Sequence, residues 1–392
     1  MAGIQAWLTV ALIIILLAIV IIERRKIKLQ KLLFPLLYIV IYRSNTGIRL
    51  MDKIAKAFPR FLRLLAFLSV VVGFLGMAFI SYALFNNTLQ LFLKPEAAPG
   101  VQPVLPINVK GVFFVPFIYW IIAIFLIAVV HEFAHGITAR LYDMKVKSSG
   151  FLFISLLIPL IPAAFVEPDE KKVVKRPALQ QYAMFASGAF SNLVFAGLIL
   201  LVLIYPISPI AEKIFQIDGV KVVKLTEKGP ADLAGLKEGE IIKMVNDIKV
   251  KTIEDFTNFL SKAEPGDEIT ITTDKSAYTF LLHTNPENPK KPFVGISTTD
   301  NLVVSKGFTA RYGKITADLF LWFISLMNWL FMLNIGIGLF NLAPLSVLDG
   351  GRMFRLAMQK IFTKQNGDRI WHLVSMVFVL MIVVNLVFGF LK

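Results

Sequence analysis

Apolar residues occur in long runs along most of this chain, and polar residues are concentrated in the segments between them. A membrane-spanning helix needs about 20 mostly apolar residues. Six runs meet this requirement, and they cover roughly residues 4–22, 64–85, 112–135, 180–205, 319–340 and 371–391. The pattern therefore predicts an α-helical polytopic membrane protein with about six transmembrane helices in a lipid bilayer.

Two further apolar segments are too short to be read as plain spans. Residues 32–42 contain Pro35 and have basic residues on both sides, so we expect this segment at the membrane interface. Residues 151–166 contain Pro159 and Pro162, which favours a segment that dips into the membrane and returns. We expect the dipping segment to line a pocket or to offer an edge that a substrate strand can join.

The segment 208–305 has a different pattern, because its hydrophobicity falls and short strand-like runs alternate with charges. This predicts an inserted α+β domain. The string from Lys228 to Ile242, with its Ala-Gly-Leu-x-x-Gly core, resembles the central part of a bacterial, permuted PDZ domain. PDZ domains bind peptides by strand addition, so a peptide or a substrate tail is the expected partner. A domain that only blocks or supports the membrane part is the alternative.

These patterns divide the chain into four parts. We expect an N-terminal transmembrane and interfacial region at 1–110, a first part of a membrane core at 111–207, the PDZ-like domain at 208–305, and a second part of the core with a C-terminal span at 306–392.

Composition and charge support a membrane protein and exclude several classes of function. Hydrophobic residues make up 56% of the chain and charged residues 17%, against about 45–50% and about 25% in soluble domains. The net charge of +15 comes from loops between apolar runs, which indicates positive-inside orientation rather than nucleic-acid binding. A multi-pass protein of the cell membrane is predicted, with residues 208–305 outside. The absence of cysteine excludes thiolate chemistry, so any metal must be held by His, Asp or Glu.

The clearest chemical signal is the string His131-Glu132-Phe133-Ala134-His135 at the end of an apolar run. Residues four apart lie on one face of a helix, so both imidazoles can reach one metal ion. A glutamate beside the first histidine can act as general base toward an activated water. Ionisable residues are costly inside a membrane, so a functional metal site is favoured over a structural polar cluster.

A catalytic zinc usually has three protein ligands, and several residues could supply the third. The other two histidines are disfavoured, because His283 lies in the inserted segment and His372 at the start of the last span, so the candidates are the carboxylates Glu167, Asp318 and Asp349. Asp349 is favoured because it ends a string in which Pro344 interrupts helix geometry and a following glycine pair permits close approach of another backbone. A broken helix with one carboxylate at membrane depth indicates the lining of a site.

The two strings together, His131-Glu132-x-x-His135 and Asn341-x-x-Pro344-x-x-x-Leu348-Asp349-Gly350-Gly351, resemble the site-2 protease family of intramembrane zinc metalloproteases. The resemblance covers about residues 112–392, and an inserted PDZ domain is also a pattern of that family. It implies one zinc ion per chain held by His131, His135 and Asp349, with Glu132 as the base. It further implies hydrolysis of peptide bonds in or near transmembrane helices of membrane-protein substrates, as in regulated intramembrane proteolysis. The positive-inside orientation puts these motifs at the inner ends of their spans, so we expect the site near the cytoplasmic side.

Asparagines near these motifs have two interpretations each. The string Gly188-Ala189-Phe190-Ser191-Asn192 is similar to an asparagine motif of the family, with alanine where proline is common. Asn192 is predicted to be catalytic, orienting the substrate backbone or stabilising the developing oxyanion, or else to form an interhelical hydrogen bond. Asn341 has the same two interpretations, and with Pro344 it is a candidate for positioning the substrate.

Three other classes of protein compete with this interpretation. A membrane zinc protease of the prenyl-protein type also has His-Glu-x-x-His, but it takes a glutamate as third ligand, and the Leu-Asp-Gly-Gly string argues against it. A zinc-binding transporter or receptor with a peptide-binding domain should show polar residues through several spans, and here they cluster at one depth. A catalytically inactive scaffold is disfavoured by Glu132.

Overall fold

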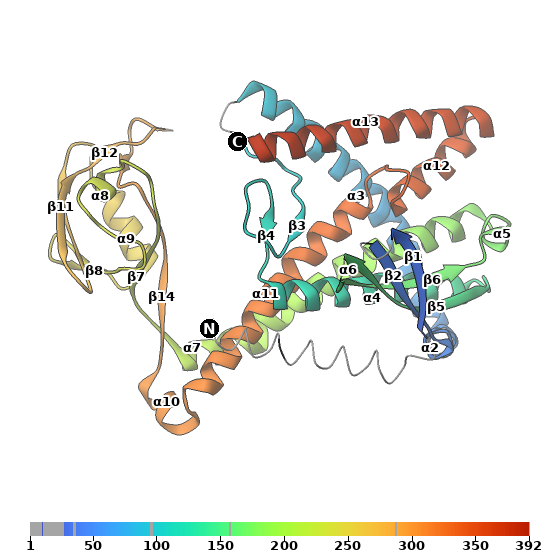
Figure 1. The fold of residues 1–392 in the computed structure, drawn as a ribbon, viewed down its shortest axis with the longest axis horizontal. Helices are drawn as coiled ribbons and strands as arrows, with labels where there is room; N and C mark the ends of the chain where they lie inside the picture. The colour runs from blue at the N-terminus through green and yellow to red at the C-terminus, as the bar shows by residue number, and fades with distance from the viewer. Residues whose placement is uncertain are drawn as a thin grey trace. The chain divides into compact units, whose positions relative to one another are not determined.

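The computed structural model describes residue 10 and residues 27–33, 37–94, 97–156, 158–286 and 288–391. The chain forms two compact units, residues 1–203 with 321–392 and residues 204–320. We call them the membrane unit and the inserted domain, and describe each separately (Figure 1).

Within the described ranges, five helices are long and apolar enough to cross a membrane. They are α3 (Pro59–Leu93), α4 (Phe117–Leu141), α6 (Ala178–Val202) with its continuation through η2 (Leu203–Ile207) and α7 (Ser208–Ile214), α11 (Lys314–Asn341) and α13 (Lys364–Leu391). Each coincides with one of the six predicted spans. The remaining prediction, residues 4–22, lies outside the described residues except for residue 10. The fold is thus that of a polytopic membrane protein, with the total number of spans left as a prediction.

Prolines mark where these helices begin and where one of them stops. Pro59 is the first residue of α3, and Pro116 and Pro177 directly precede α4 and α6, where a fixed φ near −65° suits a helix start. After α11 ends at Asn341, a loop containing Pro344 leads to α12 (Asp349–Ile361). The helix break predicted from the sequence is therefore present at the position of the Asp349 motif.

The glycine pair after Asp349 lets α12 pack against this loop. A Cβ atom on Gly351 would overlap Leu345 O and lie 3.0 Å from Ser346 N, and one on Gly350 would lie 2.6 Å from Ala343 O. Only glycine allows the backbone to come this close without displacement. This is the close approach that the sequence predicted.

A four-stranded antiparallel sheet lies beside the helices (Figure 1). Its strand order is β1 (Ile27–Leu33), β2 (Leu37–Arg43), β5 (Val146–Leu156) and β6 (Ile158–Pro168). The segments 32–42 and 151–166, expected as an interfacial and a dipping segment, thus contribute strands, and β2 pairs with β5 from Leu37↔Leu156 to Arg43↔Gly150. Strand β6 forms one edge of the sheet and contacts α4.

The smaller elements of the membrane unit connect the long helices. They are α2 (Asn45–Ala57), β3 (Val104–Leu105), β4 (Phe113–Phe114) and α5 (Glu170–Val173). Helix α4 packs on α6 and forms a buried apolar cluster with α11 through residues such as Ile127, Ile199 and Leu330. Helix α12 packs on α6 and α13, so α6 contacts both helices that carry the predicted metal ligands.

The inserted domain has a sheet of order β11-β10-β8-β7-β14 with β9 paired to β8. The strands of this sheet are β7 (Phe215–Leu225), β8 (Ile241–Val245), β9 (Ile248–Lys249), β10 (Glu268–Thr273), β11 (Ala277–Leu281) and β14 (Ile296–Val304). Strands β12 (His283–Thr284) and β13 (Pro292–Phe293) form a separate pair. Helices α8 (Pro230–Leu233), α9 (Ile253–Leu260) and α10 (Lys306–Tyr312) complete it. A core including Val220, Ile242 and Ile271 shows why strand-like alternation was visible in this part of the sequence.

Candidate metal centre

Three of the predicted ligands converge on one point of the membrane unit. His131 and His135 come from α4, and Asp349 is the first residue of α12. Asp349 Oδ2 lies 3.0 Å from His131 Nε2 and 3.2 Å from His135 Nε2, and the two Nε2 atoms are 3.1 Å apart. Among the described residues, these three side chains form a group that could hold one metal ion.

Neighbouring atoms prepare this group for a cation. His135 Nδ1 lies 2.6 Å from Met184 O, so Nδ1–H donates to that carbonyl and the lone pair of Nε2 faces the centre. Asp349 Oδ2 is buried and has no hydrogen-bond partner in the part of the chain that is described. Two imidazole nitrogens and one carboxylate oxygen are a typical catalytic zinc ligand set that leaves a fourth position open. The donor set therefore fits the zinc ion that the sequence predicted.

Gly188 of α6 provides the space in front of the two imidazoles. A Cβ atom at this position would lie 2.6 Å from His131 Nε2 and closer still to His135 Nε2. Any larger residue would therefore occupy the volume on which the ligand atoms converge. In the sequence, Gly188 stands out only as the start of the Asn192 motif, and nothing there indicates that it leaves space for the ligand atoms.

Glu132 shares a cavity of about 250 Å³ with the three ligands. Its Oε2 atom accepts a hydrogen bond of 2.9 Å from the backbone N–H of Val166 in β6. Val166 and Pro168 line one side of the cavity, and Asn341, Leu348 and other residues of the α11–α12 region line another. The predicted base is thus held at the edge of the sheet, next to the candidate metal ligands.

Asn192 lies behind His131 and does not line this cavity. Its side chain is fully buried, and its amide lies 3.2 Å from His131 Nδ1. Asn192 Oδ1 has no hydrogen-bond partner among the residues described. A 180° rotation of the amide exchanges its two polar atoms, gives His131 Nδ1–H an acceptor and leaves Nε2 to face Asp349. This arrangement favours an orienting contact with His131 over direct contact with substrate.

The remaining candidates from the sequence are dispersed. Asn341 lines the cavity, whereas Pro344 is buried in the loop and does not. Glu167 accepts a hydrogen bond of 2.7 Å from Ser148 Oγ and is not among the residues that line the cavity. The other two histidines and Asp318 are absent from the three-residue metal group.

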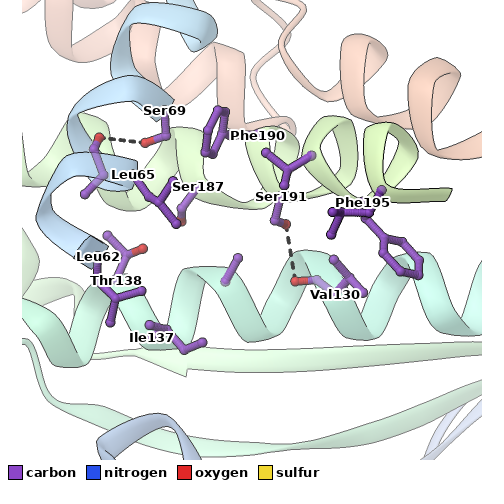
Figure 2. Close-up of a pocket in the computed structure, with 14 residues that line it drawn as sticks. Leu62, Leu65, Ser69, Val130, Ile137, Thr138, Ser187, Phe190, Ser191 and Phe195 are labelled. Atoms are coloured by element: carbon purple, nitrogen blue, oxygen red, sulfur yellow. Dashed lines mark hydrogen bonds between the residues drawn. The ribbon is translucent and has the colours of Figure 1, made fainter. Parts of the chain in front are cut away.

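A second cavity, of about 280 Å³, is lined by residues of α3, α4 and α6 and is mostly apolar. Figure 2 shows Leu62, Leu65 and Ser69 of α3 facing residues of α4 and α6 across it. Ser191 Oγ donates to Val130 O at 3.3 Å and to Gly188 O at 2.7 Å. The Ser191 hydroxyl bonds to helix carbonyls, so its hydrogen-bonding capacity is satisfied within the helices.

Backbone and cationic groups at the metal centre had no signal in the sequence analysis. The Met184 carbonyl and the Val166 amide are backbone groups, which any residue type provides. Arg352 also lines the cavity, and in the sequence it is one of many basic residues between apolar runs.

A membrane-length apolar helix that carries two histidines and a glutamate, with an aspartate from the short helix α12 beside them in one cavity, defines the class of membrane metallopeptidases. The chain belongs to peptidase family M50, whose family model matches residues 119–384. Membership in this family confirms the predicted class, a zinc metalloprotease of the site-2 protease type.

Individual relatives agree with this assignment. The chain is 30% identical over 257 residues to uncharacterized protein MJ0971 of Methanocaldococcus jannaschii, covering 64% of this chain and 60% of that protein. It is 22% identical to zinc metalloprotease RasP of Oceanobacillus iheyensis, covering 55% and 63%. It is 23% identical to regulator of sigma-W protease RasP of Bacillus subtilis, covering 50% and 54%. The chain thus spans less than two thirds of the length of these three curated relatives.

A solved domain is also similar to part of this chain. The PDZ domain of the SdrC-like protein Lmo2051 from Listeria monocytogenes is 21% identical, with a TM-score of 0.19; the match covers 21% of this chain and 87% of that domain.

Proposed function

We propose that this chain is an intramembrane zinc metalloprotease that hydrolyses peptide bonds in or near transmembrane helices of other membrane proteins. The observation that carries the proposal is the convergence of His131, His135 and Asp349 in one cavity with Glu132. Both histidines and Glu132 lie on α4, one of the helices long and apolar enough to cross a membrane. The aspartate as third candidate ligand also separates this chain from the prenyl-protein type.

The residues of the cavity divide the chemistry between them. Zinc held by the two histidines and Asp349 would supply Lewis acidity toward water and the scissile carbonyl. Glu132 would take the proton of the attacking water and deliver it to the leaving amine. The Val166 N–H fixes Oε2 of Glu132, which leaves Oε1 to accept the proton. Asn192 would hold His131 in the tautomer whose Nε2 can act as a ligand.

The edge of β6 supports binding of an extended substrate segment. A helix keeps its carbonyls in hydrogen bonds, so a substrate helix has to unwind before its backbone can be attacked. Val166 and Pro168 of this edge strand line the cavity. A segment that joined this edge would lie along the cavity as an added strand, the mode in which many sheets bind peptides.

The orientation in the membrane and the role of the inserted domain belong to the same proposal. The basic loops favour a cytoplasmic position for the ends of α4 and α12 that carry the site, and an external position for the inserted domain. We propose that this domain binds a peptide or substrate tail. A single cysteine placed near residue 270 of this cysteine-free chain should react with an impermeant reagent from outside; protection there would contradict the orientation.

The test of the proposed function compares wild type with Glu132→Gln after purification in detergent. Both proteins are incubated with a panel of single-span test proteins, with and without a chelator, and bound metal is measured. We expect cleavage by wild type that a chelator abolishes, and no cleavage by Glu132→Gln with zinc retained. Glu167→Gln is the matched control, because Glu167 bonds to Ser148 and lies outside the cavity lining. Unchanged cleavage by Glu132→Gln would refute the assignment of the base.

A further inference from the structure

Arg352 is a cationic side chain of the cavity to which the proposed hydrolysis assigns no task. It lies on α12 one helical turn after Asp349 and lines the same cavity as Glu132. It is the one lysine or arginine in that lining. Within the described ranges it has no ion-pair partner, and its side chain is exposed.

Other arginines of the membrane unit differ from Arg352 in this respect. Arg355, one turn further along α12, bonds through Nε to Asp368 Oδ1 at 2.7 Å. Arg140 at the end of α4 pairs with Asp52. These two guanidinium groups have carboxylate partners within the protein, whereas no residue that the structure describes supplies one to Arg352.

An aromatic ring keeps the Arg352 side chain on the cavity wall. Its guanidinium carbon lies 6.0 Å from the centre of the Phe185 ring, within the range of a cation–π contact. Phe185 also lines the cavity and follows Met184, whose carbonyl accepts from His135. The cation is therefore placed on the α6 side of the cavity, next to the metal centre.

We propose that Arg352 forms a carboxylate-binding subsite of this cavity, an inference that rests on the proposed function. Hydrolysis breaks the peptide C–N bond. The acyl carbon gains the oxygen of water and becomes a carboxylate, and the nitrogen takes up both protons of that water and leaves as an ammonium group. Glu132 and Asp349 repel a second carboxylate, so it would bind the planar guanidinium, which matches it with two parallel hydrogen bonds. The carboxylate has two possible sources, the new C-terminus of the product or an acidic side chain of the substrate.

The subsite can be tested by binding alone, on metal-free Glu132→Gln protein in detergent. The probes are three fluorescent apolar peptides of about ten residues: a free acid, the same peptide as C-terminal amide, and an amide with one aspartate near its end. We expect one of the two carboxylate peptides to bind about tenfold tighter than the plain amide, because a charge-assisted hydrogen bond contributes about this factor. Arg352→Gln should remove this preference, and Arg352→Lys should retain part of it. Arg355→Gln, the matched control on the same helix, should leave it unchanged.

The outcomes separate the sources of the carboxylate and the two proposals. Tighter binding of the free acid identifies the product C-terminus, and tighter binding of the aspartate peptide identifies a substrate side chain. Equal binding of all three peptides, or a preference that survives Arg352→Gln, would overturn the subsite. Since no metal and no cleavage are involved, a failure of catalysis in the earlier experiment would count against the proposed function and not against the subsite.

Discussion

The replacement Gly188→Ala offers a sharp test of the metal centre, because it adds one methyl group at the point where the ligand atoms converge. The added Cβ would lie 2.6 Å from His131 Nε2 and closer still to His135 Nε2. Non-bonded carbon and nitrogen atoms are in favourable contact only at about 3.5 Å. Both imidazoles would therefore have to retreat by about 1 Å.

A displacement of this size should remove metal binding and leave the fold intact. Metal–ligand distances are maintained within about 0.2 Å, and loss of a partner that merely orients a ligand already costs about 10–100-fold in affinity. We expect zinc affinity to fall by at least about a hundredfold. Thermal stability of the metal-free protein should not fall, because alanine is favoured over glycine inside a helix by about 1 kcal/mol.

The assay is metal content and zinc affinity of the purified protein, together with its thermal unfolding after metal removal. Gly197→Ala is the matched control, because Gly197 lies on the same helix and a Cβ there would meet nothing within 4 Å. It should bind zinc like wild type. Wild-type zinc affinity in Gly188→Ala would refute the convergence of ligands described above.

Three further predictions follow from other contacts. Val166→Pro removes the N–H that donates to Glu132, the predicted base, and this N–H does not bond to β5. Cleavage should therefore fall about tenfold or more while the circular dichroism spectrum stays unchanged. Full activity of this variant would contradict the positioning of Glu132 by Val166. Gly351→Ala should lower the thermal stability of the membrane unit by about 1–3 kcal/mol through overpacking. Gly336→Ala should not lower it, because a Cβ atom on Gly336 would meet nothing within 4 Å. Equal unfolding temperatures of the two variants would contradict the close approach of the backbone at Gly351. A hydrogen bond from Lys243, 2.8 Å away, lowers the pKa of Asp218. The pair therefore stabilises the inserted domain at pH values above the unfolded pKa of about 3.9. This stabilisation is lost as the pH falls through the lower pKa of the folded state. Lys243→Gln should therefore weaken hydrogen-exchange protection of the full chain at neutral pH by less than about 1 kcal/mol. The effect should be smaller below the folded pKa, where the mutation removes only the hydrogen bond of 2.9 Å from Lys243 Nζ to Asp218 O; a larger effect at low pH would contradict the sign.

The helices and the metal group were predictable because each leaves a local signal. A run of apolar residues such as 371–391 specifies a span by its length alone, and the structure places α13 there. The two histidines are four residues apart, so helix geometry alone brings them together. Asp349 lies more than 200 residues along the chain, but the broken helix around Pro344 gave it a signal of its own.

The sheet and the surroundings of the metal group had no such signal. The apolar segments 32–42 and 151–166 lack the alternation that identifies a strand, and β2 pairs with β5 across more than 100 residues of chain. The partner of His135 is the Met184 carbonyl, and the partner of Glu132 is the Val166 amide. A backbone partner depends on where an element lies in space, and side-chain types do not reveal it.

The first and last strands of the inserted domain, β7 and β14, lie next to each other. Ser305 N–H donates to Ile214 O at 2.8 Å, and β7 and β14 run antiparallel from this point, with Phe215 opposite Val304. A segment whose ends are adjacent can be added to a host fold or removed from it with little strain. During the evolution of this architecture, the domain can therefore be exchanged as one unit. Recombination at this junction can add, remove or replace the domain and leave unaltered the helices that carry His131 and Asp349.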